Sequence, residues 1–89
     1  MNAILHVVGV DQVGIVARVS AFMAERKINI GDINQTILSG NFVMVMMVDL
    51  AHSSTPLDVL KGELVELGEV LKVSISIMHE RVFSAMHRI

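Results

Sequence analysis

The sequence contains no cysteine, no tryptophan and no tyrosine, and it has one proline and three phenylalanines. The absence of cysteine excludes a disulfide framework, a thiolate zinc site, an iron–sulfur cluster and a cysteine nucleophile. Few aromatic rings are present for base stacking, and 9 Asp and Glu outnumber 7 Lys and Arg, which disfavours direct nucleic-acid binding. No apolar run approaches the roughly 20 residues that a membrane-spanning helix requires, so no membrane partner is expected.

What the sequence does contain is mostly apolar: hydrophobic residues make up 53% of the 89 positions, and the formal net charge is -2. This composition predicts one folded domain over residues 1–89 rather than a disordered chain. Because so short a chain buries a limited share of its surface, we expect self-association into a homodimer or higher homo-oligomer. The N-terminus shows no secretory signal pattern, which makes the cytoplasm the expected compartment.

The first half of the chain is predicted to form a strand, a helix and a second strand. Residues 3–10 are apolar on both alternating faces, as in a central strand. Asp11 is a candidate N-cap, and Gly14 permits a tight turn before an amphipathic helix that ends near Lys27. Residues 28–38 combine β-branched and polar residues, which indicates an edge strand with an irregular start.

The second half repeats this order after a predicted hairpin turn at residues 39–41. Residues 42–50 are apolar on both faces and predict a second central strand. Thr55 is a candidate N-cap of a second helix, and Gly68 is its expected C-terminal stop. The apolar stripe of this helix comprises Leu57, Leu60, Leu64 and Leu67. Residues 71–79 alternate as a half-buried strand does.

The order β-α-β-β-α-β predicts an α+β, ferredoxin-like fold. Its four-stranded antiparallel sheet has the order 4-1-3-2, with two helices on one face. A short C-terminal helical tail carrying Val82, Phe83 and Met86 is predicted to follow. The helix-free face would expose more apolar surface than a soluble monomer usually shows. The tail and a partner's sheet face are the candidate covers. We expect a homodimer that uses both, with the sheets either side by side or face to face.

The loop of residues 11–14 is the main candidate for a ligand site. Free N–H groups and the positive end of the first helix lie there and suit a carboxylate. An amino acid also carries an ammonium group, for which acceptors are available on Asp11, Asn29, Asp32 and Asn34. These residues also have a purely structural interpretation. Asp11 would cap the helix, Gly14 would allow close packing, and residues 29–32 would shape a bulge.

Other chemistry has less support. The four histidines are His6, His52, His79 and His87, and no two of them stand at i, i+4, so no metal site is predicted. His6 is expected to be a hydrogen-bonded interior residue. Ser20 has no evident His and Asp partners, and no phosphate-binding loop is present. We therefore predict that the protein is not an enzyme and carries no cofactor.

The stretch DQVGIVARVSAFMAERKINIGDINQTI, residues 11–37, resembles the corresponding part of an ACT domain, in particular Asp11-x-x-Gly14-Ile15-Val16 and Asn29-Ile30. The ending FSAMHRI is similar to that of stand-alone small bacterial ACT proteins, which resemble the ACT repeats of the glycine cleavage system transcriptional regulator. The resemblance implies a regulatory module that binds an amino acid at a dimer interface. It further implies that one chain contributes Gln12, Val13 and Gly14, and its neighbour Asn29, Ile30, Gly31 and Asp32.

Three functions follow from these observations. The first is a homodimer that senses an amino acid or related metabolite and signals to a protein partner. The second is an interaction module that binds a protein without any ligand. The third is a small enzyme with an active site between subunits. Stabilisation by a ligand favours the first, and partner binding without ligand favours the second. The third requires turnover that a single polar substitution abolishes.

Overall fold

The structure is a computed structural model that describes residues 1–82. The order of elements is β1 (Asn2–Val10), α1 (Ile15–Glu25), β2 (Asn29–Leu38), β3 (Asn41–Asp49), α2 (Leu57–Leu71) and β4 (Val73–His79). A short helical segment follows at residues 80–82. Val82 belongs to this segment, whereas Phe83 and Met86 of the predicted tail lie outside the described residues.

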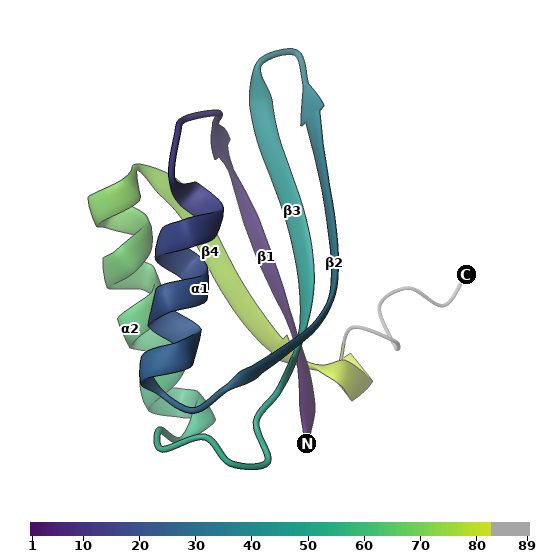
Figure 1. Cartoon of the computed structure of the whole chain (residues 1–89), viewed down its shortest axis with the longest axis vertical. Helices are drawn as coiled ribbons and strands as arrows, with labels where there is room; N and C mark the ends of the chain where they lie inside the picture. The colour runs from purple at the N-terminus through teal and green to yellow at the C-terminus, as the bar shows by residue number, and fades with distance from the viewer. Residues whose placement is uncertain (83–89) are drawn as a thin grey trace.

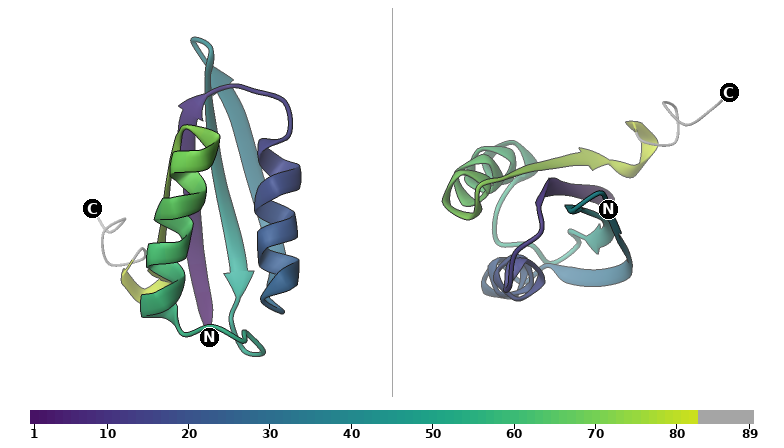
Figure 2. Two further views of the ribbon diagram at one scale, coloured as in Figure 1. Left: turned by 90° about the vertical axis from the view of Figure 1, so that its left-hand side faces the viewer. Right: turned by 90° about the horizontal axis from the view of Figure 1, so that it is seen from above.

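The four strands form one antiparallel sheet in the order β2-β3-β1-β4, which confirms the predicted order 4-1-3-2. Both helices lie on one face of this sheet, as the views in Figure 1 and Figure 2 show. The central position of β1 and β3 follows from their composition, because a central strand has neighbours on both sides and is covered most completely. The fold is therefore the ferredoxin-like arrangement that the sequence predicts.

The main hydrophobic core fills the layer between the helices and the sheet. Its fully buried members include Leu5 of β1, Met46 of β3 and Val19 of α1. Leu60 and Leu64 from the predicted stripe of α2 are also fully buried. Among residues 1–82 the buried side chains are all apolar, so folding leaves no charge in this layer that would need a partner.

The start of α1 differs from its prediction. Gly14, not Asp11, occupies the N-cap position, with a left-handed φ of 92°, and α1 begins at Ile15. Asp11 instead belongs to the loop, where its N–H donates to the carbonyl oxygen of Gly40 at 3.2 Å. The chain needs the left-handed residue to turn from β1 onto the helix, and glycine adopts that conformation without steric cost.

The ends of α2 also differ from their predictions. The N-cap is Pro56 rather than Thr55, so the helix starts one residue later than Thr55 would place it. The helix continues through Gly68 to Leu71, and Lys72 takes the left-handed conformation that ends it. The predicted last strand accordingly starts at Val73. Gly68 serves a different purpose: an added Cβ would lie 2.7 Å from the carbonyl oxygen of Val73. The glycine lets α2 approach β4 closely.

Candidate ligand site

The β1–α1 loop, residues 11–14, lies at one end of the sheet beside the β2–β3 hairpin, at the top of Figure 1. All four of its residues are exposed. The first helical hydrogen bond runs from the N–H of Arg18 to the carbonyl oxygen of Gly14, at 2.9 Å. In the described part of the chain no side chain caps α1. The N–H groups that precede Arg18 are therefore available to a carboxylate oxygen.

The four loop residues differ in what they offer a ligand. The Gln12 amide donates from Nε2 to the carbonyl oxygen of Leu71, so this side chain ties the loop to the end of α2. Val13 is fully exposed at the tip of the loop. A Cβ placed on Gly14 would meet nothing within 4 Å, which means that the space beside its backbone is open. Asp11 is exposed and adds a carboxylate. The loop thus presents an accessible backbone, one carboxylate and one apolar side chain, and the Gln12 hydrogen bond holds it in place.

The predicted site residues on β2 lie around a bulge at the start of this edge strand. The register with β3 shifts between Ile30 and Ile33, which leaves Gly31 and Asp32 in the irregular segment. The bulge that the structural interpretation expected is therefore present. Asn29, Gly31, Asp32 and Asn34 are exposed, whereas Ile30 is half-buried and packs against the core. Asn29 and Asn34 pair with Asp49 and Val45, so both lie on the helix-free face.

The loop of residues 11–14 and the start of β2, residues 29–32, lie at opposite ends of one protomer, whereas Asn34 lies midway along the sheet, beside Val45. The sheet register places Asn29 beside Asp49 and Asn2, at the start of β1, while Asp11 follows Val10 at the end of that strand. Eight residue steps along β1 span about 26 Å, at roughly 3.3 Å per residue. A small ligand cannot contact both groups in one chain. The groups can form a joint site only between two chains.

Two features near the loop were not among the predicted site residues. Gly40 holds the loop through the N–H of Asp11, a contact between segments far apart in the sequence that no local pattern indicates. Arg18 is exposed in the first turn of α1, and its guanidinium is a suitable second partner for a carboxylate. Its position four residues after Gly14, in the first turn of the predicted helix, was the available signal for this role.

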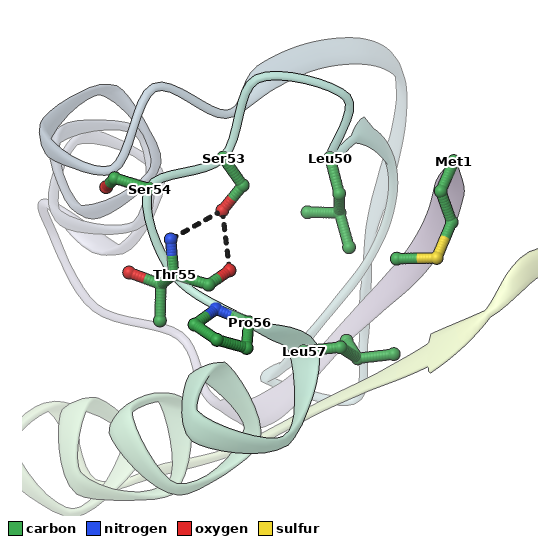
Figure 3. Close-up of a pocket in the computed structure, with 7 residues that line it drawn as sticks. All are labelled: Met1, Leu50, Ser53, Ser54, Thr55, Pro56 and Leu57. Carbon is green, nitrogen blue, oxygen red and sulfur yellow. Dashed lines mark hydrogen bonds between the residues drawn. The ribbon is translucent and has the colours of Figure 1, made fainter.

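A pocket of about 300 Å³ lies at the other end of the molecule, between the start of β1 and the β3–α2 loop. Figure 3 shows the residues that line it: Met1, Leu50, Ser53, Ser54, Thr55, Pro56 and Leu57. Ser53 Oγ donates to the carbonyl oxygen of Thr55 at 2.8 Å and accepts from its N–H at 3.2 Å. Ser54 Oγ donates to the carbonyl oxygen of Arg26 at 3.3 Å. Ser53 therefore stabilises the loop itself, and Ser54 links the loop to the end of α1.

The remaining candidates from the sequence are His6 and a histidine metal site. His6 is half-exposed on the helix-free face, so its predicted interior location is wrong. Its hydrogen bond is present: Ser76 Oγ lies 3.3 Å from His6 Nδ1. Among residues 1–82, no three His, Asp or Glu side chains are grouped closely enough to hold a metal ion.

No helix within residues 1–82 combines the length and apolar character required to cross a membrane.

The fold defines a small α+β module of the ferredoxin-like class, and comparison with known proteins identifies its family. Residues 2–78 match the family model described as ACT domain. The chain belongs to the ACT domain family, whose members are small-molecule regulatory binding modules. This confirms the resemblance seen in residues 11–37.

Individual relatives agree with this assignment. A UPF0237 protein of Listeria monocytogenes is 48% identical over 89 residues, which is the full length of both chains. An ACT domain protein from Streptococcus pneumoniae has a TM-score of 0.83 and 40% identity, covering 93% of each chain. A putative glycine cleavage system transcriptional repressor has a TM-score of 0.76 with 20% identity, covering 86% of this chain and 45% of the repressor, and shares the fold.

Proposed function

We propose that the protein is a homodimeric sensor that binds an amino acid or related metabolite between protomers and signals to a protein partner. The ACT domain match over residues 2–78 carries this proposal. The ligand's carboxylate would meet the N–H groups at the start of α1, and its ammonium group would meet Asn29, Asp32 and Asn34 of the neighbour. The ligand would signal by binding one dimer geometry more tightly than another, which shifts the equilibrium between the two geometries. A ligand with equal affinity for both would leave that equilibrium unchanged.

The arrangement of β2 supports a site between chains. In the described residues β2 and β4 are the two edge strands of the sheet, and nearly all of the side chains of β2 are exposed. If two copies meet antiparallel along this edge, the Leu38 end of one strand lies beside the Asn29 end of the other. The loop of residues 11–14 adjoins the hairpin that follows Leu38. Such a pairing therefore brings the loop of one protomer toward Asn29 of its neighbour.

The test of the sensor is thermal unfolding against the twenty amino acids and common metabolites at millimolar concentration. A ligand present at about 100 times its Kd stabilises the folded state by about 2.7 kcal/mol. That corresponds to a rise in Tm of roughly 10 °C or more for a domain of this size. We expect a selective rise for one chemical class. No rise for any member of the panel would contradict the proposed function.

The second prediction concerns the ammonium side of the site. The amino acid that raises Tm most should bind to Asn29→Ala at least about tenfold more weakly than to the wild type. The reason is that a hydrogen bond to a charged group is worth roughly 1.5–3 kcal/mol. Gln35→Ala is the matched control, since Gln35 is an exposed amide on the same strand outside the proposed site. Isothermal titration calorimetry gives the Kd of each variant for this amino acid. Equal Kd values for the two variants would remove Asn29 from the site.

One observation favours the ligand-free interaction module as the second candidate. Ile33, Ile37 and Leu38 of the edge strand are 43%, 53% and 60% exposed. An apolar edge strand is a surface on which another protein's strand can pair. A partner that binds equally well with and without every compound of the panel would support this function instead of the sensor.

A further inference from the structure

The side chain of Gln12 joins the β1–α1 loop to the end of α2. Its Nε2 donates to the carbonyl oxygen of Leu71, which lies 59 positions further along the chain. Leu71 is the last residue of α2, and the last carbonyl groups of a helix need donors from outside that helix. Gln12 therefore caps α2 from a segment that is distant in the sequence.

The β1–α1 loop is held by hydrogen bonds on two sides. The N–H of Asp11 donates to the carbonyl oxygen of Gly40 in the β2–β3 hairpin, at 3.2 Å. Gln12 holds the other side through the end of α2. Figure 1 shows the hairpin, the loop and this end of α2 at one end of the molecule. Packing does not hold the tip of the loop, because Val13 is fully exposed. The conformation of the loop therefore depends on these two hydrogen bonds.

The loop leads directly into the N–H groups at the start of α1, which are the proposed contacts of a carboxylate. These groups belong to the backbone, so their directions change whenever the loop changes its conformation. A site of this kind binds more tightly when its groups are already in place, because the ordering of a mobile segment opposes binding. The Nε2 donor of Gln12 is engaged by Leu71. Gln12 can therefore raise the affinity of the site without touching the ligand.

We propose that Gln12 is the positioning residue of the ligand site: it keeps the loop in the conformation that binds, and it does not itself contact the amino acid. The resemblance to ACT domains implies only that Gln12 belongs to the site, whereas its contact with Leu71 indicates how it acts there. As far as binding is concerned, this inference rests on the proposed function. The hold on the loop is a property of the free protein and is measurable without any ligand.

Gln12→Met tests the hold on the loop in the free protein. The change preserves the length of the side chain and removes its donor. Backbone order parameters from NMR relaxation measure the motion of Val13 at the tip of the loop. We expect an order parameter of about 0.85 in the wild type, typical of rigid backbone, and one below about 0.6 in Gln12→Met. Gln35→Met, the matched control, makes the same change at an exposed position of β2 and should leave the motion of Val13 unchanged.

The second measurement is the Kd of the panel amino acid that raises the Tm of the wild type most. Isothermal titration calorimetry gives this Kd at a temperature where all variants are folded. Gln12→Met should bind at least about tenfold more weakly, because ordering about one more backbone residue on binding lowers affinity by roughly that factor. Gln35→Met should bind as the wild type does. A residue that served only the stability of α2 would lower Tm and leave both the order parameter and the Kd unchanged.

Gln12→Lys is the rescue variant. Its ammonium group is again a donor that can reach the end of α2, and a positive charge suits the C-terminus of a helix. This variant should recover the rigid loop and most of the affinity that Gln12→Met loses.

Three outcomes would overturn the proposal. They are a loop that stays rigid in Gln12→Met, a looser loop without a weaker Kd, and an affinity that stays low in Gln12→Lys although its loop is rigid. The last outcome would show that the amide contacts the amino acid itself. If Gln12→Met does not fold, Gln12→Ala replaces it, because alanine also lacks the donor. A panel in which no compound raises the Tm of the wild type would contradict the proposed function and remove the binding role with it, whereas the order parameters alone decide the hold on the loop.

Discussion

Gly68→Ala should destabilise the protein by about 3 kcal/mol, the upper part of the range for overpacking a well-packed layer. The added Cβ would lie 2.7 Å from the carbonyl oxygen of Val73 and 3.5 Å from Cγ1 of Ile75. The closer contact is with backbone, which cannot turn aside as a flexible side chain does. The helix α2 must therefore move away from β4. Thermal unfolding at fixed protomer concentration should show Tm at least about 10 °C lower.

Gly62→Ala is the control for this prediction and should have the opposite sign. Gly62 lies in the same helix, is exposed, and has nothing within 4 Å of an added Cβ. Replacing a helical glycine with alanine at such a position stabilises by about 1 kcal/mol. Tm should then rise by roughly 4–8 °C. If both variants lowered Tm equally, the lack of space at Gly68 would not be the cause of its loss of stability, and the expected gain in helix propensity at Gly62 would be wrong.

Gly14→Val should remove the ligand response while the protein still folds. Gly14 has a φ of 92°, and a valine in this left-handed conformation lowers the stability of the folded state by about 2 kcal/mol. Its side chain would also fill the open space beside the N–H groups of α1, which a carboxylate needs. We expect the Tm rise given by the panel's best amino acid to fall to less than a tenth of the wild-type value. The rise is measured by recording Tm of the wild type and of the variant at increasing concentrations of that amino acid.

Gly40→Val separates loss of binding from loss of stability. Gly40 has φ of 80° and nothing within 4 Å of an added Cβ, so valine there causes comparable backbone strain. It lies in the hairpin turn, and its contact with Asp11 uses only backbone atoms. This variant should lose similar stability and keep its ligand response. Equal loss of the response in both variants would show that the backbone at Gly14 does not contact the ligand.

The alternation of apolar residues was sufficient to predict the elements and their order. Residues 42–50 are apolar on both faces, and β3 is central, with Met46 and Val48 fully buried beneath the helices. The stripe in α2 was equally informative, because Leu60 and Leu64 are fully buried. These predictions held because burial on one or two faces imposes a period on the chain itself.

The predictions that failed concern single residues at element ends and on the sheet. Asp11 has the residue type of a cap, but the chain uses a left-handed glycine to turn onto α1. Gly68 has the residue type of a helix stop, yet Val73 lies so close that the position needs a residue without Cβ. His6 was expected inside and is half-exposed. In each case the backbone conformation or the packing of neighbouring elements decided the outcome, and residue type alone does not specify either.

The sequence by itself determined the α+β architecture, the family and the two segments that could supply a ligand site. It did so because periodic burial and a recognisable loop are local properties of the chain. Only the tertiary structure decided how these segments lie: the loop and the start of β2 are at opposite ends of one protomer, and Gln12 is bound to Leu71. The register of the sheet sets the spacing between them, and at roughly 26 Å it is too long for one small ligand within a single chain.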